Sequence, residues 1–409
     1  MTSYMIGEET SVKDEPGFNA LLASAYRAKI RPKCLCKTPP VEMYVAKLDE
    51  KFFIKRMPNS GSEHHFGCDS FDPPPELSGL GQVQGTAIKE NTQDGTTELR
   101  FDFSLTKVSG RKPPEKQEAQ GASVKAVVSK LTLISTLHYL WEEAHLNRWA
   151  PAMSGKRGWF VIHKYLLQAA QSKRVKGGIS LASVLFIPEN FVLENKEEIA
   201  RRRMGQMVHA TNNVAKGPRK LMLFIGEVKQ IENAWFGHQL VLKHLPDFHF
   251  LMNEDMHKRI TKRFEDELGM RRAAEDTHLM CVGTFSLSAS ATATLEEVAL
   301  MVVNQNWIPI ESLAEKQLID SLVASGRKFT KCLRYNIARD KPVACALATD
   351  TSPTATAMYI ARNTDKTYRE NLEELIRVSE FDSWVWPAAE ACMPQLPAQA
   401  LVHQSQGNP

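Results

Sequence analysis

Five side chains that often bind metal ions lie close together near the start of the chain. Three are cysteines, Cys34, Cys36 and Cys68, and two are neighbouring histidines, His64 and His65. Structural zinc takes four thiolate or imidazole ligands in a tetrahedron. The residues between the two groups predict a β-hairpin, and a hairpin would bring the groups together as in a zinc ribbon. The pattern therefore predicts one structural Zn²⁺, held by the three cysteines and one of the two histidines.

The spacing leaves the choice of histidine open. His65 and Cys68 have two residues between them, a common spacing for a second ligand pair, and His64 is the alternative. Four ligands leave no open position, which favours a structural ion over a catalytic one. Because so small a unit buries little core, we expect the ion to contribute on the order of 10 kcal/mol to its folding. Cys36→Ser should then release the ion and loosen residues 31–72. The alternative is that these thiols and imidazoles meet by accident in a proline-rich loop.

The composition sets the broad class of the protein. The chain has 409 residues, of which 43% are hydrophobic and 24% charged, as in ordinary globular domains. This length predicts two or three domains. The cysteines number seven, and those outside the cluster are scattered, so a disulfide framework is not expected. Neither a signal peptide nor an apolar segment of membrane-spanning length is evident, and we expect a cytoplasmic protein.

The hydrophobic periodicity predicts an α+β protein with several domains. These are a zinc-ribbon-like and β-hairpin region at 1–108, a linker at 109–123, a basic helical region with a winged-helix-like order at 124–215, an α/β region at 216–309, an α-β-β-β-α-β unit at 310–388 and a disordered tail at 389–409. Helices are predicted at 17–29, 124–145, 159–171, 194–212, 253–268, 311–324 and 366–378. The apolar run at 179–187 predicts a strand.

The middle of the chain is basic. Residues 154–229 contain fourteen Lys or Arg against five Glu. Clustered cations release counterions from phosphates, so this segment predicts contact with DNA or RNA without base-specific recognition. The alternative is an ordinary solvated surface. The candidate contacts are Lys156, Arg157, Lys173, Arg174, Lys176, Arg201, Arg202 and Arg203.

The C-terminal unit has the element order of the PD-(D/E)XK nuclease core. Such nucleases hold Mg²⁺ with carboxylates on adjacent strands. Here the strand predicted at 342–349 has no internal acid, and the strand at 354–360 lacks the Glu-x-Lys pattern. We therefore expect a nuclease-like scaffold without catalysis. The alternative is a divergent metal-dependent nuclease that uses Glu311, Glu315 and Asp350.

Other residues that could do chemistry have simpler interpretations. Four histidines, His238, His244, His249 and His257, have spacings that fit no ligand template, so packing or surface roles are expected. Trp384 and Trp386 alternate along a predicted strand, which indicates core packing rather than a base-stacking platform.

The segments around the cysteines resemble a known family. Residues 31–36 (RPKCLC), 41–46 (VEMYVA), 54–58 (IKRMP) and 64–68 (HHFGC) are similar to the start of a bacterial family labelled domain of unknown function 1173. The resemblance implies a bacterial protein encoded on conjugative or integrative elements. It implies no activity, but the setting of transferred DNA favours contact with nucleic acid.

These observations give three hypotheses for function. The first is a zinc-stabilised nucleic-acid-binding accessory protein of a bacterial mobile genetic element, without catalysis. The second is a metal-dependent nuclease with a divergent PD-(D/E)XK site. The third is a protein–protein scaffold that binds no nucleic acid.

Overall fold

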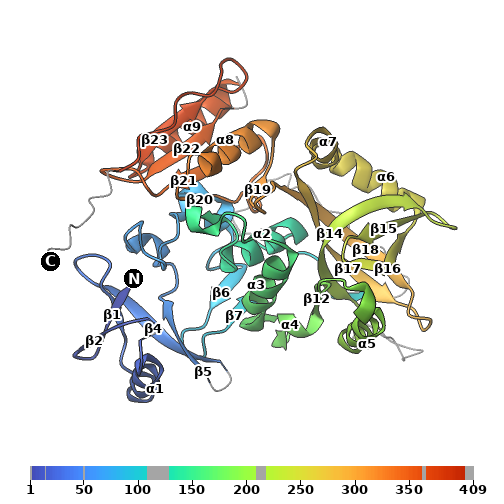
Figure 1. Ribbon diagram of the computed structural model, residues 1–409, viewed down its shortest axis with the longest axis horizontal. Helices are drawn as coiled ribbons and strands as arrows, with labels where there is room; N and C mark the ends of the chain where they lie inside the picture. Colours follow the sequence, from blue (N-terminus) through green and yellow to red (C-terminus); the bar gives the residue numbers. More distant parts are fainter. Residues whose placement is uncertain are drawn as a thin grey trace, which may run out of the picture.

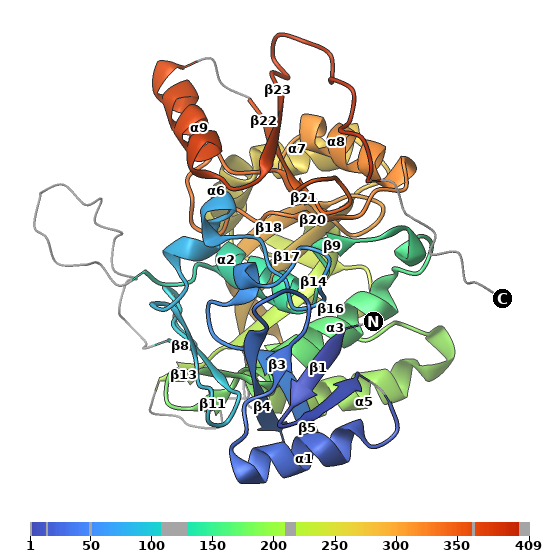
Figure 2. The same ribbon diagram turned by 90° about the vertical axis from the view of Figure 1, so that its left-hand side faces the viewer.

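The computed structural model describes residues 2–13, 15–48, 51–107, 129–208, 218–361 and 365–400. It shows a mixed α+β protein (Figure 1). A sheet near the N-terminus lies on one side of the central helices, a closed barrel lies on the other, and the C-terminal strands and helices form a third unit (Figure 1, Figure 2). One hydrophobic core contains residues from Leu80 to Trp386. It crosses the domain boundaries that the sequence predicts after residues 215 and 309.

The N-terminal sheet is antiparallel and has the strand order β2-β1-β3-β4-β5. Helix α1 (Phe18–Ala28) covers one face, because Phe18, Leu22 and Ala25 recur at helical spacing and are buried there. The helix ends at Lys29, which has a positive φ of 56°. This helix-backed sheet is larger than the zinc-ribbon-like hairpin that the sequence predicts. Its strands are β1 (Ser3–Ile6), β2 (Glu9–Val12), β3 (Lys33–Cys34), β4 (Val41–Leu48) and β5 (Lys51–Arg56).

The centre of the molecule holds α2 (Leu133–Glu143), α3 (Trp159–Gln171) and a four-stranded sheet of order β11-β10-β7-β6. Residues 173–175, in the basic region expected to have a winged-helix-like order, form strand β10, which pairs in parallel with β7. The strand predicted at 179–187 divides into β11, the short helix α4 (Leu181–Val184) and β12 (Leu185–Phe186). A short buried apolar run can form either a strand or a helix, so the sequence pattern alone could not predict the helix within residues 179–187. The strands of this sheet are β6 (Ile88–Glu90), β7 (Thr97–Leu99), β10 (Lys173–Val175) and β11 (Ile179–Ser180).

Five strands close into a barrel in the order β14-β15-β16-β18-β17, and β17 pairs again with β14. All neighbours are antiparallel except β16 and β18, which are parallel. A register shift between Val228 and Gln230 lets the first half of β14 pair with β17 and the second half with β15. The strands are β14 (Met222–Asn233), β15 (His238–Leu242), β16 (Leu245–Met252), β17 (His278–Leu287) and β18 (Ala293–Val303).

Helices connect β16 to β17 of the barrel. The sequence predicts one helix at 253–268, but the structure has α6 (Glu254–Arg263) and α7 (Glu265–Ala273), separated at Phe264. The Asn253 side chain caps α6 by accepting a hydrogen bond from the Met256 backbone N–H at 2.9 Å. Phe264 is buried, so the break keeps an apolar side chain in the core between two charged helices.

The C-terminal unit confirms the predicted α-β-β-β-α-β order. Its sheet has the order β23-β22-β21-β20-β9, in which β22 and β23 are parallel and β9 (Arg148–Trp149) comes from the central region. Residues 389–400, expected to belong to a disordered tail, lie against this unit: the Trp384 indole donates to the Gln395 carbonyl at 2.9 Å. The elements are α8 (Leu313–Ala324), β20 (Phe329–Lys331), β21 (Ala346–Ala348), β22 (Thr356–Ile360), α9 (Lys366–Val378) and β23 (Asp382–Trp386).

The remaining elements complete the chain. The helix predicted at 124–145 begins at Leu133, where the Thr132 hydroxyl accepts from the Ser135 N–H; residues 124–128 and the predicted linker at 109–123 lie outside the described residues. In the described part of the chain, no helix has the length and apolar character needed to cross a membrane. The other elements of the described residues are β8 (Thr106–Lys107), α5 (Lys196–Met207), β13 (Arg219–Lys220), β19 (Pro309–Ile310) and the short 3-10 turns η1 (Gly61–Glu63), η2 (Pro75–Leu77), η3 (Gly79–Gln82), η4 (Pro151–Met153) and η5 (Leu193–Asn195).

Candidate metal centre

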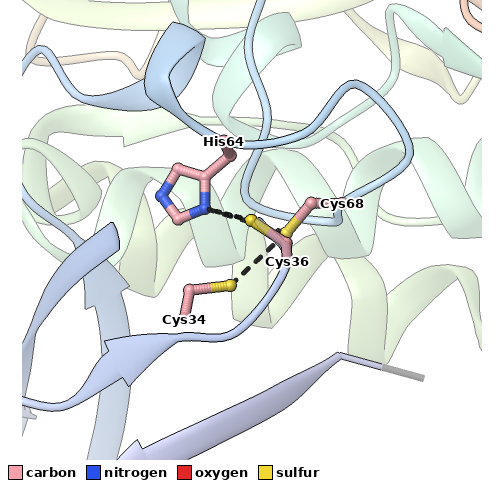
Figure 3. Close-up of side chains that lie close together, drawn as sticks. All are labelled: Cys34, Cys36, His64 and Cys68. Carbon is pink, nitrogen blue, oxygen red and sulfur yellow. Dashed lines mark hydrogen bonds between the residues drawn. The ribbon is translucent and has the colours of Figure 1, made fainter. Parts of the chain in front are cut away.

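Two loops bring the predicted zinc ligands together at one end of the N-terminal sheet. Cys34 is the last residue of β3, and Cys36 lies on the turn that follows it. His64 comes directly after the 3-10 turn η1 (Gly61–Glu63), and Cys68 lies farther along the same loop. The loop after β5 folds back over the end of β3, so the four side chains point toward a common centre (Figure 3).

The distances between the ligand atoms suit a tetrahedral zinc site. The Cys34 and Cys68 sulfurs are 3.7 Å apart, and His64 Nδ1 lies 3.4 Å from the Cys36 sulfur and 3.8 Å from the Cys68 sulfur. All four ligand atoms lie within 4.8 Å of one another. Zn–S bonds of about 2.3 Å at tetrahedral angles place two sulfurs about 3.8 Å apart. The donor set and its spacing therefore fit Zn²⁺ with four protein ligands.

The geometry selects His64 over His65 as the fourth ligand. His64 is only 3% exposed and turns Nδ1 toward the sulfurs. His65 is exposed, its Nδ1 accepts from the Gly67 N–H at 3.1 Å, and its ring stacks on Phe66. The His65 backbone N–H nevertheless donates to the Cys36 sulfur at 3.4 Å. His65 thus supports the cluster through its backbone, while its side chain lies outside it.

The surroundings of Cys68 favour the thiolate, which is the form that binds metal. The hydrogen bond from the Cys34 thiol is the largest cause that lowers the pKa of Cys68, to about 3, and the His64 ring and the Ser70 N–H add to it against the effect of burial. The pKa of Cys34 is raised in turn, because the two sulfurs share one proton. Tyr4 feels the same negative charge: burial, followed by the two cysteines, raises its pKa to about 12.

Asp72 fixes the loop that carries His64 and Cys68. Its carboxylate pairs with Arg56 at the end of β5 and with Arg148 on β9, the latter at 2.6 Å. Arg148 also donates to the backbone carbonyls of Asp69 and Phe71, each at 2.7 Å. A Cβ on Gly61 would approach Asp72 to 2.8 Å, so the loop requires glycine there. The candidate zinc loop is therefore bound to both the N-terminal and the C-terminal sheet.

Cys68 also contacts two separate hydrophobic clusters. One is the core between α1 and the N-terminal sheet, to which Cys34 belongs. The other contains Phe71 and Leu77 of the loop together with side chains of β21, β22 and α9 in the C-terminal unit. A metal ion at this position would thus stabilise the place where these two units meet.

The carboxylates of the nuclease alternative do not converge. Glu311 accepts from Arg334 at 2.8 Å. Glu315 accepts from the Glu311 N–H at 2.8 Å and is buried near Lys331. Asp350 accepts two hydrogen bonds from Arg327, at 2.9 and 2.8 Å. Strands β21 (ALA) and β22 (TAMYI) carry no acidic or basic side chain. Within the described residues, none of the three acids belongs to a group of side chains that could hold a metal ion.

Most of the cations predicted to contact nucleic acid have partners inside the protein. Lys173 is 2% exposed and pairs with Glu143, and the buried Arg203 pairs with Asp247 at 2.9 Å. The others with internal partners are Arg157, which donates to three backbone carbonyls; Arg174, which donates to two; and Arg202, which pairs with Glu189 and Glu198. Lys156, Lys176 and Arg201 are exposed. The basic segment therefore offers fewer available charges than its composition suggests.

A family model described as "Protein of unknown function (DUF1173)" matches residues 4–389. The chain belongs to this family. The match confirms the resemblance seen around the cysteines and extends it over the barrel and the C-terminal unit. No curated protein and no solved structure matches the chain. Because the family description names no activity, the function has to be inferred from the geometry.

Two aromatic side chains that the sequence analysis did not assign a role are the most exposed large apolar residues of the described chain. Trp235 is 94% exposed and Phe236 is 85% exposed, both in the turn between β14 and β15 of the barrel. A signal was present in the sequence, because turns are normally polar and a Trp-Phe pair in one is unusual. Its meaning depends on the barrel, which the periodicity of the strands did not reveal.

Proposed function

We propose that this protein is a zinc-stabilised binding protein for single-stranded nucleic acid, and that it has no catalytic activity. The observation that carries the proposal is the closed five-stranded barrel with two fully exposed aromatic side chains on its first turn. The zinc site stabilises the N-terminal unit and its junction with the C-terminal sheet. The expected setting, a bacterial mobile genetic element, remains a prediction from the family resemblance.

The strand order of the barrel supports this proposal. In chain order its strands are paired 1-2-3-5-4-1, with the third and fifth parallel and the helices placed between the third and fourth. This is the arrangement of an OB-fold, in which the face of the second and third strands and the loop between the first and second bind oligonucleotides. The loop that carries Trp235 and Phe236 is the loop between the first and second strands.

The turn at residues 233–237 is built to hold the aromatic pair in place. The Ala234 N–H donates to the Gly237 carbonyl at 3.0 Å and closes the turn. Gly237 has a φ of 79°, and a Cβ there would approach the Met252 carbonyl oxygen to 2.5 Å. Only glycine fits, so the turn lies firmly against the end of β16. The backbone that carries the two rings is thus held in place, so binding would have to order only the two side chains.

The exposed rings have a physical reason to bind bases. Large apolar side chains that stay in water mark interaction sites. Base–aromatic stacking contributes about 1–3 kcal/mol per base and tolerates any sequence, because every base has a π-face. The limited number of free cations in the basic segment agrees with a mode in which stacking supplies much of the affinity. We therefore expect a weaker salt dependence than a groove lined with cations would give.

The nuclease alternative lacks a comparable observation. Within the described residues its three acids form no group that could hold a metal ion. Glu311 and Asp350 pair with Arg334 and Arg327, and Glu315 accepts from the Glu311 N–H and lies 3.6 Å from Lys331. A hydrolytic metal site needs carboxylates fixed close together on adjacent strands. The family resemblance is equally compatible with a non-catalytic protein.

Fluorescence anisotropy with labelled single-stranded DNA, single-stranded RNA and duplex DNA tests the proposal. We expect the single strands to bind, and Trp235→Ala and Phe236→Ala each to weaken binding about tenfold to a hundredfold. Phe53→Ala is the matched control, because Phe53 is an exposed aromatic (42%) on the N-terminal sheet. The affinity of Phe53→Ala for the single strands should equal that of the wild type.

Three outcomes would overturn the proposal. If the protein binds no single strands, the proposal is wrong and the protein–protein scaffold hypothesis is favoured. Binding that both alanine variants retain would place the contact elsewhere on the molecule. Cleavage of plasmid DNA in Mg²⁺ or Mn²⁺, abolished by Asp350→Ala, would establish the nuclease instead.

A further inference from the structure

A second group of metal-binding side chains comes together at the end of the barrel. His238 Nε2 lies 2.8 Å from Oε2 of Glu254. The ring of His257 stacks on the ring of His238, with centroids 3.6 Å apart and planes tilted by only 18°. One ligand atom from each of the three residues lies within 4.8 Å of the others. The group contains no sulfur and is far from the cysteines in sequence.

Regular structure holds the three residues in place. His238 is the first residue of β15 and pairs in the sheet with Met252, the last residue of β16. The chain then passes through the Asn253 cap into α6, so Glu254 and His257 lie one turn apart on the same face of that helix. Gly237, which no other residue can replace without a clash, sets the start of β15 against this point. The three side chains are thus positioned by the barrel and the helix.

An ordinary ion pair does not account for the whole group. Glu254 and His238 form such a pair, and Oε1 of Glu254 lies 3.5 Å from Lys258 Nζ. His257 is not needed for either contact, and within the described residues its ring has only the stacking contact with His238. A divalent cation bound at the edges of the two rings would give His257 a role, and the carboxylate of Glu254 would offset part of its charge.

The composition of the group fits a divalent transition metal. Two imidazoles and one carboxylate are a ligand set of zinc sites that keep an open position for water or another group. Bonds of about 2.1 Å place two imidazole nitrogens roughly 3.0–3.4 Å apart. To bind one ion, the two rings would have to turn out of their stack so that both nitrogens face the same point. His238 and His257 are partly buried and Glu254 is exposed, so one side of the site faces solvent.

We propose that His238, Glu254 and His257 form a second metal site, which binds a divalent transition metal such as Zn²⁺ and leaves a coordination position open to solvent. It differs from the cysteine cluster in having three protein ligands, no thiolate and an exposed side. The site lies directly beside the turn with Trp235 and Phe236, but the inference does not depend on nucleic-acid binding.

Metal content of the full-length protein, purified without a histidine tag and dialysed against a small excess of Zn²⁺, tests the site. We expect two ions per chain in the wild type and one in His257→Ala or His257→Gln. Glu254→Gln should weaken the second ion by at least about tenfold. His249→Ala is the matched control, because His249 lies on β16 of the same barrel and its Nε2 bonds to the Pro246 carbonyl at 2.9 Å. It should keep both ions.

Substitution with Co²⁺ separates the two sites. Only the cysteine cluster can give sulfur-to-metal charge-transfer absorption, and this band should be unchanged in His257→Gln and reduced in Cys36→Ser. One ion per chain in the wild type would overturn the proposal. So would a second ion bound equally by the wild type, His257→Ala and Glu254→Gln, because that ion would be adventitious.

Discussion

Cys36→Ser removes one of the four ligands of the candidate zinc site and leaves the hydrophobic contacts around it in place. The expected consequence is local. Nine buried apolar residues, Cys34 among them, form the core between α1 and the N-terminal sheet, and the partly buried Cys36 packs against its edge. Among the described residues, the loop with His64 and Cys68 contacts this core only through Cys68. We therefore expect the loop to open while the sheet remains, a narrower effect than the loosening of residues 31–72 that the sequence suggests.

The size of the effect follows from the linkage between binding and stability. An ion that binds only the closed loop stabilises it by about 4 kcal/mol when free zinc exceeds the dissociation constant a thousandfold. Each 1.4 kcal/mol changes a population about tenfold, so amide exchange in the loop should accelerate about a thousandfold when the ion is lost. The amides of His65 and Ser70 report this directly, because they donate to the Cys36 and Cys68 sulfurs at 3.4 Å.

Hydrogen-exchange mass spectrometry at fixed free zinc measures this change. Peptides from the loop should exchange faster in Cys36→Ser, and peptides from β17 and β18 should not change. Cys392→Ser is the matched control, because Cys392 is exposed and lies outside the cluster. If the variant loses its metal but the loop amides keep their protection, the ion does not stabilise the loop and the reasoning fails.

Two further predictions concern partly buried charged residues. Burial, and then the charge of Asp72, raise the pKa of Glu142 to about 7, so its protonated form stabilises the fold below pH 4.5 and this contribution is lost as the pH rises through 7. The wild type should therefore lose about 3 kcal/mol of its free energy of unfolding between pH 4.5 and 8, relative to Glu142→Gln, in denaturant unfolding. A difference in free energy of unfolding between the two proteins that does not change with pH would contradict the raised pKa of Glu142. Arg148→Ala removes the hydrogen bonds to Asp69, Phe71 and Asp72 and should destabilise the protein by about 3 kcal/mol in the same assay, whereas a loss below 1 kcal/mol would show that Arg56 alone satisfies Asp72.

Much of the secondary structure could be predicted because its signals are local. The helix predicted at 159–171 has the bounds of α3, and that at 366–378 has the bounds of α9, since strong periodicity and clear ends define both. The order of the C-terminal unit was predicted for the same reason. The break at Phe264 and the division of residues 179–187 were not, because tertiary burial rather than local pattern decides them.

The barrel and the two candidate sites beside its first turn depend on contacts that sequence spacing does not encode. The β14–β17 pairing, which closes the barrel, joins residues far apart in the chain. His238 and His257 fit no ligand template by spacing, yet the register between β15 and β16 brings them together. The cysteine cluster could be predicted because its ligands are unusual residue types, but only the fold distinguishes His64 from His65. For the basic segment, counting charges cannot reveal internal partners such as Glu143 for Lys173, and its contact with nucleic acid stays a prediction.

The position of Asp72 between Arg56 and Arg148 bears on how the molecule can be divided. A single carboxylate joins a strand of the first sheet to a strand of the last one, and the neighbouring Phe71 fills part of the C-terminal core. Deleting the first 72 residues would leave Arg148 without its partners and expose apolar surface on β21 and β22. The cysteine-bearing segment is therefore an integral part of the architecture, and it is not a detachable module that could be transplanted to another protein.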